Sequence, residues 1–154
     1  MRWWQPDAWI PDVIGDPGFA DWLAIHTVKA RYCRLLDTKD WAGWRALFAD
    51  DLVLDTTAAG GVRIDGADAA VAYVRATITD DTITTHQVHT PEITVTGDTA
   101  TAIWAMMDRN IWPGGRALIG YGHYHEDYVR QNGIWKIARS QLTRLSVEMT
   151  AAAD

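Results

Sequence analysis

The chain has 154 residues, of which 48% are hydrophobic and 22% are charged, and these values predict one globular domain and exclude a disordered chain. The 20 acidic residues outnumber the 14 basic ones, and no cluster of Lys and Arg stands out, so nucleic acid is not an expected partner. The single cysteine excludes a framework of intramolecular disulfides.

The N-terminal segment lacks the apolar stretch of a secretion signal, and no apolar run approaches the ~18 residues that span a membrane. We therefore expect a cytoplasmic protein without membrane contact. Residues 1–18 are rich in Pro and Gly, and we interpret them as an arm that packs on the body through Trp3, Trp4 and Trp9. A domain is predicted for residues 19–146 and a tail for 147–154. The nine tryptophans fit either core packing or a pocket for a flat apolar ligand.

The first half of the chain has a helical pattern. Ile25, Val28, Tyr32 and Leu35 recur at spacings of three and four, which predicts a helix from an N-cap at Asp21 to about residue 37. The basic residues of this helix are expected on its remaining, exposed surface: Lys29, Arg31 and Arg34. The elements predicted next are a helix over 41–48, strands over 52–56 and 62–64, and a helix over 67–76.

The second half is rich in β-branched residues and turn signals. Strands are predicted over 82–96, 99–111, 118–130 and 134–145, and Asn132-Gly133 is a strong signal for a hairpin turn. Helices followed by an antiparallel meander indicate the α+β class rather than alternating βαβ units. A four-stranded sheet with helices on one face would leave a cup between the two layers.

The histidines are the first candidates for chemistry. His123 and His125 share one face of a strand and could bind zinc together with His86 or Asp127. The helical HExxH and Cys-rich spacings of recognisable zinc sites are absent, so we expect no metal site and no cofactor. The alternative pair is His86 with Asp37, because a carboxylate that orients one imidazole nitrogen leaves the other as a base near neutral pH.

Three segments resemble a known family: RYCRLLDTKDWAGWRALFADDLVLD, THQVHTPEITVTGDTATAIW and HYHEDYVRQNGIWKI. They are similar to SnoaL-like proteins of the nuclear-transport-factor-2-like superfamily, over about residues 19–145. The placement of Tyr32, Asp37 and His86 is similar to the branch that includes scytalone dehydratase, bile-acid 7α-dehydratase and hexachlorocyclohexane dehydrochlorinase.

This resemblance implies a cone-shaped, curved antiparallel sheet packed on three helices, with the ligand inside the cone. It implies that Asp37 and His86 form a catalytic dyad there and that Tyr32 assists them. It also implies a set of substrate-binding residues: Arg144, Leu54, Thr56, Met106, Tyr124 and Leu142. His123 and His125 would then lie on the outer face of the sheet, where relatives pack into homo-oligomers, and we expect a trimer or a dimer.

The sequence departs from these relatives at several polar positions. Scytalone dehydratase has tyrosines where this chain has Leu36 and Thr56, and its second catalytic histidine has no clear match, with Asn110 lying nearby. An isomerase of the ketosteroid isomerase design is disfavoured, because its basic aspartate corresponds to Thr56.

The resemblance therefore predicts a cofactor-independent lyase that dehydrates a small, hydrophobic, polycyclic or aromatic hydroxylated substrate. His86 would remove a carbon-bound proton, Asp37 would hold the imidazole, Tyr32 would donate a hydrogen bond to the developing oxyanion, and Arg144 would bind a polar substituent or polarise the carbonyl. Two alternatives remain open at this point. One is a polyketide cyclase or isomerase that uses the same cup, and the other is a non-catalytic domain that binds a small molecule.

Overall fold

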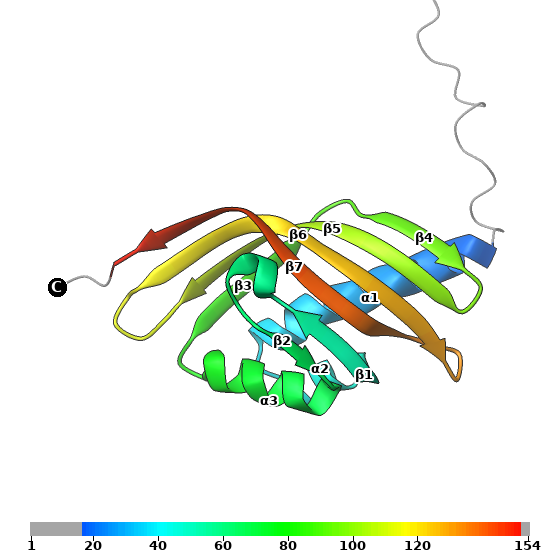
Figure 1. Ribbon diagram of the computed structural model, residues 1–154, viewed down its shortest axis with the longest axis horizontal. Coiled ribbons are helices and arrows are strands. Elements are labelled where there is room, and N and C mark those ends of the chain that lie inside the picture. The colour runs from blue at the N-terminus through cyan, green and yellow to red at the C-terminus, as the bar shows by residue number, and fades with distance from the viewer. Residues whose placement is uncertain (1–16, 152–154) are drawn as a thin grey trace, which may run out of the picture.

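The computed structural model describes residues 17–151. Figure 1 shows a long, curved sheet with α1 and α3 on the same side of it. The helices are α1 (Pro17–Asp37), α2 (Trp41–Arg45), the 3-10 helix η3 (Thr57–Ala59) and α3 (Ala67–Thr77). The strands are β1 (Phe48–Asp55), β2 (Arg63–Asp65), β3 (Ile83–Val88), β4 (Glu92–Thr96), β5 (Thr99–Ile111), β6 (Ala117–Gln131) and β7 (Ile134–Thr150).

The seven strands form one sheet in the order β2-β1-β7-β6-β5-β3, and β4 also pairs with β5. All neighbours are antiparallel except β1 and β7, which run parallel. This architecture confirms the predicted α+β class with a curved sheet packed on helices. The expectation of four strands was wrong, because β1 and β2 extend the sheet at one edge and the segment predicted as one strand over 82–96 divides. The break falls at Thr90-Pro91, where proline lacks the N–H that a continuous ladder requires.

The predicted apolar face of α1 is confirmed, since Ile25, Val28, Tyr32 and Leu35 are all buried. The expected N-cap at Asp21 was wrong, because the helix begins at Pro17, a residue whose fixed φ suits the first turn. The Asp21 carboxylate instead accepts hydrogen bonds from the β6–β7 hairpin. The donors are Arg130 Nη2 at 2.7 Å and Trp135 Nε1 at 3.1 Å.

Two further boundaries differ from the prediction. The second helix ends at Arg45 rather than at residue 48, and Phe48 is instead the first residue of β1, fully buried and paired with Ile137 of β7. Burial against the sheet overrides the helical continuation that the sequence allows. At the other end of the chain, β7 continues to Thr150, into the segment expected to be a tail, because its last residues pair with the start of β6.

The β6–β7 hairpin turns at Asn132 and Gly133, with φ angles of 52° and 79°, as the dipeptide predicts. The predicted arm with Trp3, Trp4 and Trp9 lies outside the described residues. Among residues 17–151, no helix has the length and hydropathy needed to cross a membrane.

Candidate active site

A cavity of about 120 Å3 lies between the helices and the inner face of the sheet. Its walls come from α1, α2, α3, β1, β3, β5, β6 and β7 and from the segments that follow β1 and α3. The lining residues are Tyr32, Leu36, Trp44, Leu54, Thr56, Val74, Ile78, His86, Asp108, Tyr124, Ser140 and Leu142. Four of the six residues expected to bind the substrate line this cavity: Leu54, Thr56, Tyr124 and Leu142. The other two do not, since Met106 is buried outside the cavity wall and Arg144 is not among the lining residues.

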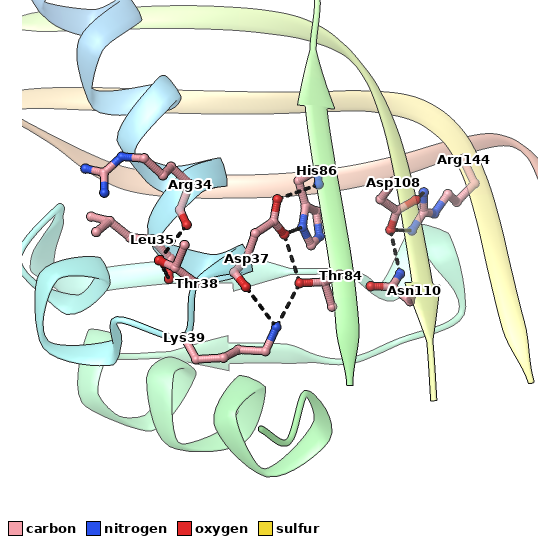
Figure 2. Close-up of polar contacts among 10 residues, drawn as sticks. All are labelled: Arg34, Leu35, Asp37, Thr38, Lys39, Thr84, His86, Asp108, Asn110 and Arg144. Atoms are coloured by element: carbon pink, nitrogen blue, oxygen red, sulfur yellow. Dashed lines mark hydrogen bonds and ion pairs between the residues drawn. The ribbon is translucent and has the colours of Figure 1, made fainter. Parts of the chain in front are cut away.

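The end of α1 meets the middle of β3 at the cavity. Asp37 Oδ1 lies 2.6 Å from His86 Nδ1, and Asp37 Oδ2 accepts the backbone N–H of His86 at 2.8 Å (Figure 2). The imidazole is 7% exposed and the carboxylate 20%. Both side chains are therefore largely removed from solvent, and the two groups approach as the sequence resemblance implies.

A further pair of polar residues, which the sequence reading missed, fixes this carboxylate. Thr84 Oγ1 donates to Asp37 Oδ1 at 2.8 Å and accepts from Lys39 Nζ at 3.0 Å, while Lys39 Nζ also donates to the Asp37 carbonyl at 3.3 Å (Figure 2). Thr84 precedes His86 by two residues, so the period of a strand places both side chains on one face. That spacing was the available signal for Thr84.

These contacts set the chemistry of the imidazole. A carboxylate that carries charge can only accept, so His86 Nδ1 donates to Asp37 and the lone pair of the neutral ring is on Nε2. Within residues 17–151, no side chain or backbone group forms a hydrogen bond with Nε2. The ring can therefore act as a base toward a ligand in the cavity, with Asp37 stabilising the imidazolium that results.

An ion pair lies beside Asp37 and His86 on the same face of the sheet. Asp108 is the direct partner of His86 in the β3–β5 register, and it binds Arg144 of β7 through two parallel hydrogen bonds of 2.6 and 2.8 Å. Asn110 Nδ2 donates to the same carboxylate at 3.1 Å. Among Asp108, Asn110 and Arg144, only Asp108 lines the cavity, so Arg144 meets the site through that carboxylate.

The Asp108–Arg144 pair crosses the sheet over a glycine. A Cβ at Gly120 would lie 2.6 Å from Asp108 Oδ1 and would also clash with the Arg144 guanidinium, so a larger residue here would displace the pair. Burial alone would lower the pKa of Arg144, but the hydrogen bonds and charge of Asp108 hold that pKa above its ordinary value. Arg144 therefore keeps its positive charge in this contact.

Two tyrosines form the deep wall of the cavity. Tyr32 on α1 and Tyr124 on β6 are both buried, with ring centroids 5.9 Å apart. Burial is the main cause that raises the pKa of each phenol well above its ordinary value. The next cause is the charge of Glu126 for Tyr32 and the neighbouring Tyr32 for Tyr124. Both hydroxyls therefore stay protonated and can donate a hydrogen bond to a ligand oxygen.

The remaining histidines do not join this site. His123 and His125 alternate with Tyr124 along β6, so they project from the opposite face of the sheet, and His125 Nε2 lies 3.3 Å from Thr143 Oγ1. In the described part of the chain, no three side chains of His, Cys, Asp or Glu are grouped so that they could hold a metal ion.

The chain is similar to known proteins both in sequence and in fold. Residues 19–141 match the model of the SnoaL-like domain. Among solved structures, the chain is similar to the Kfla4162 protein from Kribbella flavida, with 20% identity, a TM-score of 0.79 and coverage of 85% of this chain and 95% of that one.

Two further solved structures share the fold. A candidate scytalone dehydratase from Novosphingobium aromaticivorans is 22% identical, with a TM-score of 0.77 and coverage of 94% of this chain and 96% of that one. The hexachlorocyclohexane dehydrochlorinase LinA-type3 from Novosphingobium barchaimii is 17% identical, with a TM-score of 0.75 and coverage of 88% and 94%.

Proposed function

Since the chain belongs to the SnoaL-like domain family, we propose that it is a cofactor-independent lyase that removes water from a small, hydrophobic, hydroxylated substrate. One observation carries this proposal. Asp37 Oδ1 lies 2.6 Å from Nδ1 of an imidazole that lines a largely apolar cavity. This is the arrangement that a general base needs, with one ring nitrogen oriented and the other directed to a ligand.

The cavity volume narrows the substrate class. Apolar cavities of roughly 150 Å3 accommodate benzene, and this cavity measures about 120 Å3. One ring or a comparably sized group therefore fits inside, and the rest of a larger, polycyclic substrate would extend through the mouth. The apolar wall of Leu36, Leu54 and Leu142 suits such a group.

In the proposed reaction, His86 Nε2 takes a proton from a carbon next to a carbonyl group. The electron pair of that C–H bond moves onto the carbonyl oxygen, where the phenols of Tyr32 and Tyr124 donate hydrogen bonds to the developing charge. The electrons then return, the bond to the β-hydroxyl breaks, and the imidazolium gives its proton to the departing hydroxyl, which leaves as water. Asp37 keeps the imidazole oriented throughout.

Two reactions test this proposal without knowledge of the natural substrate. Exchange of the α-protons of tetralone in D2O, followed by NMR, reports proton abstraction. Dehydration of the aldol of benzaldehyde and acetone, followed by absorbance of the conjugated product, reports elimination. We expect His86→Ala and Asp37→Asn to lower both rates by ~10²–10⁴-fold, the usual contribution of a general base.

The matched control is His125→Ala, which removes an imidazole from the opposite face of the sheet and should leave both rates unchanged. Wild-type rates no faster than buffer, or equal rates in the wild type and both dyad variants, would contradict the proposed function.

A further inference from the structure

A buried ion pair lies directly behind the deep wall of the cavity. Lys29 Nζ on α1 donates to Glu126 Oε1 on β6 at 2.6 Å, and neither side chain is exposed at all. Ser140 Oγ donates to the same oxygen at 2.9 Å, and the Tyr128 hydroxyl donates to Oε2. The sequence pattern had placed Lys29 on the exposed surface of the helix, and that expectation was wrong.

The ammonium group of Lys29 lies over the rings of the two tyrosines that line the cavity. Lys29 Nζ lies 3.5 Å from the ring centroid of Tyr124 and 4.1 Å from that of Tyr32. A cation at this distance over an aromatic face interacts favourably with the ring, the more so away from water. The faces of both rings contact the ammonium, and both residues line the cavity.

Stability alone gives little reason for this arrangement. Desolvation of two buried charges offsets most of their attraction, and apolar residues of similar volume commonly replace such pairs without loss of stability. A fixed buried charge does have value where negative charge develops during a reaction, because a site that is oriented in advance needs no reorganisation. The ammonium is held in place by Glu126 and lies one aromatic ring away from the cavity.

We propose that Lys29 is a positioning residue that stabilises, through the rings of Tyr32 and Tyr124, negative charge on a ligand oxygen in the cavity. Lys29 does not line the cavity and acts only through the two phenols, which remain protonated donors. This inference rests on the proposed function, since it assigns the groups that support the oxyanion formed when His86 removes a proton.

The test uses para-nitrophenol, a single-ring ligand whose neutral and ionised forms differ in absorbance. The double variant Lys29→Met/Glu126→Gln removes both buried charges while keeping similar side-chain volumes. We expect the ratio of bound phenolate to bound phenol, at one pH, to be about fivefold higher in the wild type, because the ammonium lies against the two tyrosine rings that line the cavity. The variant should also show a lower kcat for dehydration with KM little changed.

The matched control is Lys136→Met/Glu92→Gln, which removes one charge of each sign from positions outside the buried core. It should bind the probe as the wild type does. Equal phenolate ratios in the wild type and the buried double variant would overturn the proposal.

A measurement on the wild type alone decides the question if the buried double variant does not fold. The proposal requires that wild-type protein bind the phenolate form, so binding of the neutral phenol only, or of neither form, would also overturn it. The phenolic proton of the probe can pass to His86 Nε2, so the comparison is repeated in the His86→Ala background, where the ratio should still be higher with the Lys29–Glu126 pair than without it. Failure of the lyase proposal would appear in the exchange assay, and failure of the Lys29 proposal in the phenolate ratio.

Discussion

Two of the polar pairs that connect α1 to the sheet differ in access rather than in distance. Asp37 with His86 and Lys29 with Glu126 are each separated by 2.6 Å. His86 lines the cavity and Asp37 is partly exposed, whereas Lys29 and Glu126 contact only protein. A short contact therefore does not identify a reactive group. A ring nitrogen that a ligand can reach does identify a reactive group. The buried Lys29–Glu126 pair can act only through its neighbours.

This contrast leads to different expectations for stability. Lys29→Met leaves the Glu126 carboxylate buried without its cation, and we expect a loss of about 3–5 kcal/mol in the free energy of unfolding. The double variant Lys29→Met/Glu126→Gln leaves no buried charge and should recover most of that loss. Urea denaturation followed by circular dichroism measures both values.

The control from the other pair is Asp37→Asn, whose partly exposed side chain retains one accepting oxygen. It should cost much less stability than Lys29→Met while costing far more activity. Equal stability losses in the two single variants would remove the distinction between the pairs.

A smaller effect is expected at the start of α1. Hydrogen bonds from Arg130, then from Trp135, hold the pKa of Asp21 below its ordinary value of 3.8. A depressed pKa in the folded state means that the ionised carboxylate stabilises the fold above pH 3.8 and that this contribution disappears as pH falls through the folded-state pKa.

The difference in urea midpoint between wild type and Asp21→Asn should therefore be largest near neutral pH and should vanish in acid. Asp81→Asn changes an exposed carboxylate that forms no ion pair within residues 17–151, and it should show no such trend. A midpoint difference for Asp21→Asn that is the same at neutral and acidic pH would contradict this reading.

The smallest effect concerns the single thiol, which lies on the buried side of α1. Burial raises the pKa of Cys33 to about 11, so the thiolate is scarce at neutral pH. We expect no reaction of the native protein with Ellman's reagent and full reaction after unfolding. Ala30→Cys places a thiol on the exposed side of the same helix and should react in the native state. Rapid native reaction of Cys33 would show that this side of α1 opens to solvent.

Elements with a strong local signal could be predicted from the sequence. The spacing of apolar residues located the inner face of α1, and β5 occupies Thr99–Ile111 as expected. Local signals failed where contacts distant in sequence decide the structure. The segment from Trp41 to Phe48 is short and apolar enough for helix or strand, and pairing with β7 decides that Phe48 belongs to a strand.

The site was predictable to a different degree at each position. The pairing of Asp37 with His86 came from resemblance, because a separation of 49 residues carries no geometric information by itself. Lys29 follows Val28 of the apolar face, and its position in the sequence predicts an exposed cation. Its burial depends on the ion pair with Glu126, and only the packing of α1 against β6 in the fold brings these two residues together.

The parallel pairing of β1 with β7 also bears on how the protein forms during synthesis. Leu54 of β1 and Leu142 of β7 lie on neighbouring strands and both line the chamber, yet β7 is the last of these strands to leave the ribosome. Until it emerges, the edge of β1 that pairs with β7 has no partner strand, and contacts this distant in sequence form slowly. We expect nascent chains that end before residue 134 to depend on chaperones and to gain protease resistance only once the final hairpin is complete.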